Sequence, residues 1–138
     1  MAVIWHRIAP DGRIAVIGSE PQICFYSHRR PATGFIYMYP LTEAQPRAVA
    51  MQEQMLGEVE KARPEYAVLV NLASSWAEQP DPDMSILDGF NGQLREQFQL
   101  AAWVKVYPDG RTEFQGTAPA GFAVPPTEKC LVYVYRRK

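Results

Sequence analysis

The apolar residues of this chain fall into short runs separated by turn-forming residues, and the first run introduces the pattern. Arg13-Ile-Ala-Val-Ile-Gly18 is apolar after its first residue and stops at a glycine. An uninterrupted run of this length is typical of a strand covered on both faces. A polar turn and a second apolar segment follow. The stretch therefore predicts a strand, a loop and a helix, the order in which an open α/β sheet begins.

The helix after this turn is predicted to be short. Ser19 or Glu20 can cap it, and Pro21 suits its first turn, where a missing N–H costs no hydrogen bond. A second strand is predicted from Gly34 to Tyr39, because both of its alternating faces are largely apolar. We expect the apolar side chains of the short helix to point inward, namely Ile23, Phe25 and Tyr26.

The best-defined helix is predicted between Ala48 and Ala62, where apolar residues recur at steps of three and four. Thr42 and Gln45 have the spacing of a capping box, but Pro46 leaves the start of the helix open. Pro64 ends it, because the residue before a proline is pushed out of helical geometry.

An apolar strand is predicted next, at Tyr66–Leu72, followed by a loop over residues 73–83. Asp83 can cap a further helix. The apolar residues of that helix follow the helical period at Leu87, Phe90, Leu94 and Phe98.

The last third of the chain changes character. Residues 100–107 and 112–115 flank the turn Pro108-Asp-Gly-Arg111 and predict an antiparallel hairpin. Residues 116–129 are rich in Gly, Pro and Ala and predict a surface loop, and Cys130–Tyr135 predicts a final strand. Residues 3–9 fit either a helix end or an edge strand.

This order of elements predicts an α/β fold. We expect a three-layer α/β/α sandwich with parallel strands in its centre and antiparallel strands at one edge. Residues 1–138 are expected to form a single α/β domain, since this length buries roughly two-thirds of the surface that the unfolded chain exposes.

Composition narrows the function classes. The chain has 14 basic and 15 acidic residues, a formal net charge of −1, and both signs are spread along it. This pattern lacks the basic footprint of a nucleic-acid-binding domain, so no nucleic-acid partner is predicted. No apolar run approaches the ~18 residues that a membrane-spanning helix needs.

No metal or cofactor site is predicted. Cys24 and Cys130 are the only cysteines and lack metal-ligand spacing. They are either two buried thiols or a disulfide, which requires Cα atoms within about 7 Å of each other. The turn after the first strand has one glycine, so it matches neither a dinucleotide fingerprint nor a phosphate loop.

Four polar residues form the first part of the candidate ligand set. Glu20 and Gln22 follow the first strand, where ligands of α/β sheets gather, although both also suit capping and loop hydrogen bonds. Arg29 and Arg30 can grip a phosphate through bidentate guanidinium donors. The same two residues can instead form a solvated helix end that complements the macrodipole.

Two aromatic residues complete the set. Tyr37 and Trp76 lie near predicted strand ends, where they can stack on a sugar or pack at the rim of the core. No catalytic residue is predicted, because the histidines, His6 and His28, have no serine or cysteine nearby in a recognisable nucleophile setting. Asp81 and Asp83 are interpreted as turn and cap residues.

The first thirty residues of the segment 10–115 carry a family resemblance. The run Arg13-Ile-Ala-Val-Ile-Gly-Ser-Glu-Pro-Gln-Ile23 resembles the soluble C-terminal domain of bacterial membrane glycosyltransferases, which are similar to dolichyl-phosphate-mannose protein mannosyltransferases and the lipid A aminoarabinose transferase. Further matching residues are Phe25-Tyr26-Ser27, Arg29-Arg30, Ala32-Thr33-Gly34, Tyr37, Tyr39-Pro40-Leu41, Arg63-Pro-Glu-Tyr66 and Pro108-Asp-Gly110. Cys24 and Met38 depart from the pattern.

The resemblance implies a longer parent enzyme, from which this chain would be excised. Such a parent has a membrane-embedded bundle that uses a polyprenyl-phosphate sugar donor, and its catalytic carboxylate lies in that bundle, so no catalytic residue is carried over. The domain would lie at the periplasmic face of the inner membrane, where a Cys24–Cys130 disulfide is chemically permitted.

The sequence therefore indicates two alternative functions. The first is a non-catalytic domain that contacts the membrane-embedded part of its parent and positions a glycan or lipid-linked sugar or stabilises the enzyme. The alternative is an independent α/β enzyme or small-ligand-binding domain with a site at the carboxyl ends of its strands.

Overall fold

The computed structural model describes residues 11–76, 83–116 and 131–138. The predictions for residues 3–9, for most of the loops 73–83 and 116–129, and for Asp81 and Cys130 lie outside these ranges. The Cys24–Cys130 pairing stays a prediction for the same reason.

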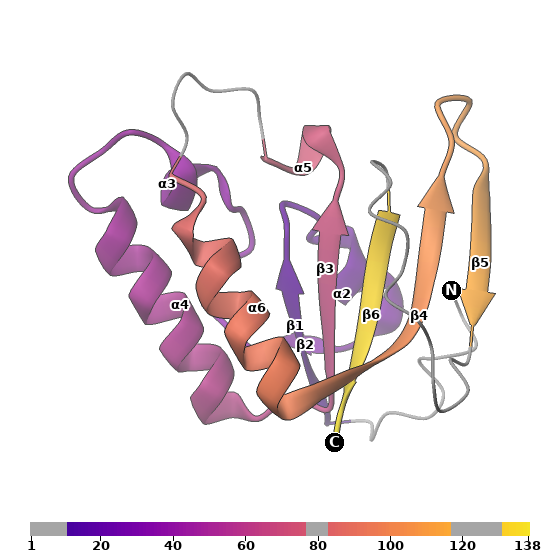
Figure 1. Ribbon diagram of the computed structural model, residues 1–138, viewed down its shortest axis with the longest axis horizontal. Coiled ribbons are helices and arrows are strands. Elements are labelled where there is room, and N and C mark those ends of the chain that lie inside the picture. Colours follow the sequence, from indigo (N-terminus) through magenta and orange to yellow (C-terminus); the bar gives the residue numbers. More distant parts are fainter. Residues whose placement is uncertain (1–10, 77–82, 117–130) are drawn as a thin grey trace.

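The described residues form an α/β fold around a six-stranded mixed sheet with strand order β2-β1-β3-β6-β4-β5 (Figure 1). β1 is parallel to β2 and β3, whereas β6 is antiparallel to both β3 and β4, and β5 is antiparallel to β4. The elements are β1 (Arg13–Ile17), α2 (Gln22–Ser27), β2 (Arg30–Pro31), α3 (Tyr39–Thr42), α4 (Ala48–Ala62), β3 (Tyr66–Asn71), α5 (Ala73–Trp76), α6 (Ser85–Gln97), β4 (Phe98–Val106), β5 (Thr112–Gly116) and β6 (Leu131–Arg137).

This arrangement confirms the predicted α/β class. The first strand, the helix over 48–62, the third strand, the hairpin and the final strand all lie where the apolar pattern places them. The parallel strands β2, β1 and β3 fill one half of the sheet, so β2 is an edge strand and the parallel part is not central.

Helices lie on both faces of the sheet, but they cover one face much more than the other. On one face α4 and α6 lie side by side (Figure 1), and their buried residues Met55, Val59 and Phe90 meet Ala15 and Ile17 of β1. On the other face α2, which has only six residues, adds Ile23 to a core made of strand residues.

The predicted strand at 34–39 is wrong. β2 contains only Arg30 and Pro31, and α3 begins at Tyr39. Ile36 and Tyr37 are about half exposed, so the alternation that predicted two buried strand faces belongs to a surface segment. Met38 is fully buried and starts a helical turn, which suits Pro40 because its missing N–H costs nothing there.

The inward orientation predicted for Phe25 and Tyr26 is also wrong. Their exposed fractions are 73% and 75%. A helix of six residues offers one narrow buried stripe, and Ile23 and Ser27, four positions apart, occupy it. The two aromatic rings therefore point to the opposite side and form an edge-to-face pair with centroids 5.3 Å apart.

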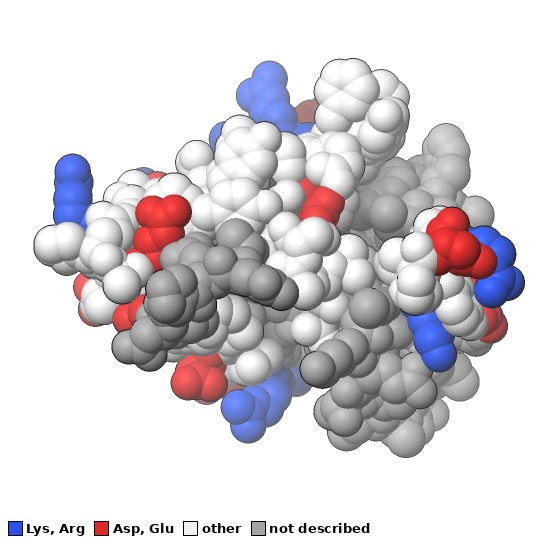
Figure 2. Space-filling view, turned by 90° about the horizontal axis from the view of Figure 1, so that it is seen from above, with Lys and Arg blue, Asp and Glu red and all other residues white. Residues whose placement is uncertain are grey.

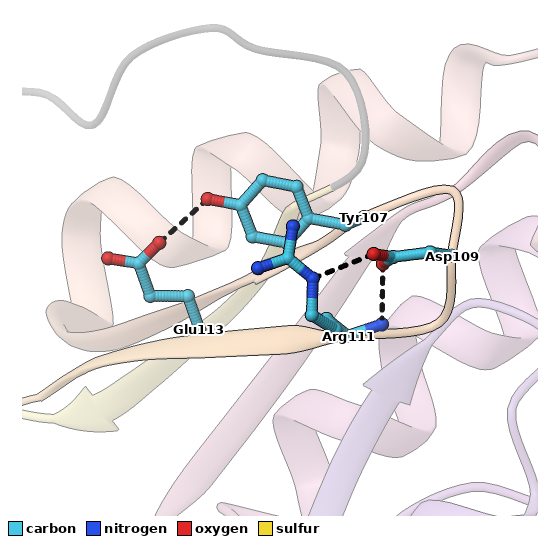
Figure 3. A network of polar contacts seen from close by, with 4 residues as sticks. All are labelled: Tyr107, Asp109, Arg111 and Glu113. Carbon is cyan, nitrogen blue, oxygen red and sulfur yellow. Dashed lines mark hydrogen bonds and ion pairs between the residues drawn. The ribbon is translucent and has the colours of Figure 1, made fainter.

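The hairpin between β4 and β5 closes through its own polar side chains (Figure 3). Asp109 accepts hydrogen bonds from the Arg111 backbone N–H at 3.0 Å and from its Nε at 2.7 Å. The Arg111 guanidinium lies 4.8 Å from the centre of the Tyr107 ring. The hydroxyl of Tyr107 donates to Glu113 at 2.7 Å, and this bond raises the pKa of Tyr107. These contacts confirm the predicted turn and give the cluster a structural role.

The prediction that Asp83 caps α6 is wrong, because Met84 occupies the cap position, but the Asp83 carboxylate bonds Ser85 at the start of the helix and gives an expected pH dependence. The Asp83 carboxylate accepts the Ser85 backbone N–H at 3.0 Å and lies 2.6 Å from the Ser85 hydroxyl, which lowers the pKa of Asp83. A lowered folded-state pKa stabilises the fold above the ordinary aspartate pKa of about 4, and the contribution is lost as the pH falls through the folded-state value. Asp83→Asn is therefore expected to lose less stability than the unmodified protein between neutral pH and about pH 3.

Urea unfolding at a series of pH values measures this difference. Asp88→Asn is the matched control, because Asp88 lies in the first turn of the same helix and is exposed. Parallel pH profiles for the unmodified protein and Asp83→Asn would show that the Asp83–Ser85 hydrogen bonds do not contribute to stability.

Candidate functional site

The carboxyl ends of β1 and β3 adjoin at the edge of the sheet where an α/β fold ordinarily binds its ligand. β1 and β3 are parallel neighbours. The chain leaves β1 toward α2 on one face and leaves β3 toward α6 on the other. Such a divergence opens a crevice between the two strand ends, which is the usual ligand position in open α/β sheets.

Here the crevice is filled by the protein itself. A Cβ atom on Gly18 would lie 2.6 Å from Val70 Cβ and 2.9 Å from Ser75 Oγ, so the chain after β1 passes directly against the end of β3. The Ser19 backbone N–H donates to Ser75 Oγ at 2.8 Å and to the Ser75 carbonyl at 3.2 Å. Ser75 is fully buried and Ser19 nearly so. These contacts occupy the space that a ligand would need.

Further hydrogen bonds tie the segment before α3 to the same place. The Met38 backbone N–H donates to Ser19 Oγ at 2.8 Å, and the Tyr39 hydroxyl donates to the Ser74 carbonyl at 3.0 Å. We call the group of Ser19, Met38, Tyr39, Ser74 and Ser75 the strand-end lock. The hydroxyls of Ser19 and Ser75 accept backbone N–H groups, so they serve packing.

The strand-end lock has a measurable strength. Ser19→Ala removes the acceptor of the Met38 N–H, and Met38 is fully buried. A buried donor without a partner costs about 1–3 kcal/mol, so the free energy of unfolding should fall by that amount in urea titrations. Ser74→Ala is the control, because Ser74 is exposed and enters the lock through its carbonyl. A Ser19→Ala protein as stable as the control would show that the lock contributes nothing.

Four of the six predicted ligand residues belong to this end of the sheet. Glu20 and Gln22 lie next to the lock, where the Gln22 side-chain amide donates to the Glu20 carboxylate. The Trp76 indole N–H is half-buried and donates to the Val70 carbonyl at 2.8 Å, so it is engaged within the protein. Tyr37 is about half exposed and stacks on Tyr39, with ring centroids 6.1 Å apart.

The structure places the two predicted arginines at the opposite end of β1. Arg30 pairs with Arg13, the first residue of β1, whereas Gly18 follows its last residue. The cause is the direction of α2, which returns the chain to the start of the strand before β2 begins. Arg29 lies in this return, where its backbone N–H bonds the Cys24 carbonyl. The six residues therefore do not form one site.

The surface around the lock is mainly uncharged. Viewed from above the strand ends, the middle of the molecule is mostly white, and most blue and red groups lie toward its periphery (Figure 2). Ile36 and Tyr37 are exposed by 48% and 47%, and Tyr39 is partly exposed beside them. We call Ile36, Tyr37 and Tyr39 the aromatic rim.

An open groove of about 520 Å³ lies near the start of α4, which the sequence reasoning missed. Its volume falls in the range of small-molecule sites, roughly 300–1,000 Å³. Its wall combines apolar groups with two amides and one guanidinium. The lining residues are Gly34, Phe35, Pro40, Gln45, Arg47, Met51 and Gln54.

The spacing of three groove residues could have indicated this groove from the sequence. Arg47, Met51 and Gln54 recur at steps of four and three, so they share one face of α4. That face mixes polar and apolar residues beside the buried stripe of α4, which contains Ala48, Gln52, Met55 and Val59. The groove can hold a small polar molecule whose apolar side rests on Phe35 and Met51.

The described residues include one cysteine, Cys24, and one histidine, His28. They contain no group of three or more His, Cys, Asp or Glu side chains arranged to hold a metal ion. Cys24 is half-buried, and burial raises the pKa of its thiol, which disfavours the nucleophilic thiolate. His28 lies with Arg29 and Arg30 away from the strand-end lock.

Comparison with known proteins adds no family assignment. No protein-family model matches the chain, and no curated protein or solved structure matches it at a significant level. Within the part of the chain that the structure describes, no helix has both the length and the apolar character to cross a membrane. The glycosyltransferase resemblance therefore stays a prediction.

Proposed function

We propose that this chain is a non-catalytic domain of a membrane glycosyltransferase that uses a polyprenyl-phosphate sugar donor. In this proposal the aromatic rim contacts loops of the membrane-embedded part of the enzyme outside the membrane and steadies them. The domain then lies at the periplasmic face of the inner membrane, in line with the resemblance of its first strand, turn and helix to that family.

The filled crevice between β1 and β3 carries this proposal. Open α/β sheets ordinarily bind their ligands in that crevice, whereas here Gly18 and Ser19 pack against Val70 and Ser75. The exposed Ile36 and Tyr37 beside the lock offer an apolar, aromatic contact area of the kind that is enriched in protein interfaces.

The coding sequence upstream of this segment supplies the first test. We expect several hundred additional codons that specify many apolar spans. Transfer assays supply the second test. The 138-residue chain alone is expected to transfer no sugar from a polyprenyl-phosphate donor, and the parent enzyme is expected to do so. Sugar transfer by the isolated chain would refute the non-catalytic assignment.

The rim is tested in the parent enzyme. Tyr37→Ser is expected to lower sugar transfer about tenfold if the rim contacts the enzyme's loops, because an aromatic contact of this kind is worth roughly 1–2 kcal/mol. Val49→Ser is the matched control, since Val49 is an exposed apolar residue on α4 outside the rim. Equal activity of both variants would remove the rim from the proposal.

The groove beside α4 supports the second candidate, an independent small-ligand-binding domain. Its volume and its mixture of amide, guanidinium and apolar groups suit a small polar molecule. Amide shifts of the isolated chain titrated with free monosaccharides measure this directly. Saturable shifts confined to residues 34–54 would favour this candidate over the first.

A further inference from the structure

The end of the sheet opposite the lock gathers positive charge that the net charge of −1 conceals. Arg13 of β1 pairs with Arg30 of β2. Ile14 of β1 pairs with Tyr66 of β3, and Tyr66 pairs in turn with Arg136 of β6. We call Arg13, Arg30, Arg63, Arg95, Arg136 and Lys138 the basic pole.

Contacts between the elements hold these residues together. Lys138 Nζ donates to the Arg95 carbonyl at 2.7 Å, which joins the ends of β6 and α6. Arg63 lies close enough to Arg137 for its charge to add to the burial that lowers the pKa of Arg137. Arg137 Nε in turn donates to the Pro64 carbonyl at 3.0 Å.

The acids at this end do not balance the pole. They are Asp11, Glu60, Glu65 and Glu96, and Glu65 lies 3.7 Å from Arg136. The six cations of the pole outnumber these four carboxylates, which leaves a local excess of positive charge. Such an excess attracts an anionic surface over about one Debye length, roughly 8–10 Å.

The exposed aromatic pair lies beside this charge. Phe25 and Tyr26 lie two to five residues before His28 and Arg30 in the sequence, and both rings are about three-quarters exposed. Exposed aromatic rings next to cations match the chemistry of the lipid headgroup region, where rings sit at the interface and cations meet anionic lipids. A long polyanion such as nucleic acid fits less well, because the chain as a whole is slightly negative.

We propose that the basic pole and the Phe25–Tyr26 pair bind the surface of an anionic lipid bilayer. The inference deepens the proposed function and rests on it for the presence of a membrane nearby.

Vesicle cosedimentation with the 138-residue chain tests the proposal. The chain is expected to bind phosphatidylcholine vesicles that contain about one third phosphatidylglycerol, to bind pure phosphatidylcholine weakly, and to dissociate at about 0.5 M salt. Each arginine near an anionic surface is worth about fivefold in affinity, so Arg13→Gln combined with Arg30→Gln should weaken binding about 25-fold.

Two more double variants separate the contributions. Phe25→Ser combined with Tyr26→Ser should weaken binding about tenfold or more, because both rings lose their interfacial contact. Arg47→Gln combined with Arg111→Gln removes the same charge far from the pole, where Arg47 precedes α4 and Arg111 lies in the hairpin turn. This control should bind like the unmodified chain, and circular dichroism verifies that all variants fold.

The outcomes are decisive in each direction. Absence of binding to the anionic vesicles, equal binding to both vesicle types, or equal loss in the control would overturn the proposal. Tighter binding to single-stranded DNA through the same arginines would overturn it in favour of a nucleic-acid surface. If the chain does not bind vesicles, the lipid proposal fails but the sugar-transfer test of the proposed function is unaffected. If the parent enzyme transfers no sugar, the proposed function fails but the vesicle-binding result still stands.

Discussion

Gly18→Ala is expected to lower the free energy of unfolding by about 3 kcal/mol or more. The added Cβ would lie 2.6 Å from Val70 Cβ and 2.9 Å from Ser75 Oγ, closer than non-bonded atoms approach. Overpacking of this kind costs about 1–3 kcal/mol. Gly18 also has φ +147°, a backbone conformation that side chains disfavour by about 1–3 kcal/mol.

Gly57→Ala is the matched control for this prediction. Gly57 lies inside α4, and an added Cβ there meets no atom within 4 Å. Alanine should stabilise the helix by about 0.5–1 kcal/mol, so the two substitutions should act in opposite directions in urea titrations. If Gly18→Ala is as stable as the unmodified protein, the close approach of the two strand ends is wrong, and the strand-end crevice is open to a ligand.

Phe90→Ala is expected to cost about 3–5 kcal/mol, because it empties the space of a ring that is fully buried between α6 and the sheet. The loss of stability is the sum of the transfer free energy of the removed atoms and the cost of the cavity that they leave behind. Phe25→Ala provides the comparison, since this phenylalanine is 73% exposed and should change stability by no more than about 0.5 kcal/mol.

This pair also separates folding from function. Phe25 is expected to matter for lipid binding while contributing little to stability, and Phe90 is expected to show the reverse. A large stability loss for Phe25→Ala would mean that its ring packs within the domain, and it would remove the aromatic part of the proposed lipid contact. A small loss for Phe90→Ala would contradict the packing of α6 on the sheet.

The strand-end lock changes how the opening stretch of the chain is interpreted. Its residues were candidates for a ligand turn, because they follow the first strand of an α/β sheet. The structure uses Gly18 and Ser19 to close that position and engages the Trp76 indole with the Val70 carbonyl. The candidate functional surfaces therefore lie around the lock and at the basic pole.

Local patterns predicted most of the elements correctly. The continuous apolar runs of β1 and β3 need no knowledge of their neighbours, because a strand buried on both faces has few polar positions. The helical period of α4 and the turn residues of the β4–β5 hairpin likewise depend only on residues within the element itself. Their predictions are confirmed.

The errors arose where the same local pattern fits two environments. Phe35, Ile36 and Tyr37 alternate like a buried strand, but Ser19 binds the Met38 N–H and turns the chain into α3. Phe25 and Tyr26 are apolar enough for a core, yet the short α2 buries only one stripe. In both cases the environment of the residue depends on contacts that the local apolar pattern does not contain.

The sequence by itself determined the α/β class, the positions of the main strands and helices, and the residue types available for binding. Only the tertiary structure decided that β6 enters between β3 and β4, that Gly18 meets Val70, and that Arg29 and Arg30 lie far from Glu20 and Gln22. The physical reason is that periodicity reports which face of an element is buried, whereas strand order and site assembly depend on contacts between residues far apart in the chain.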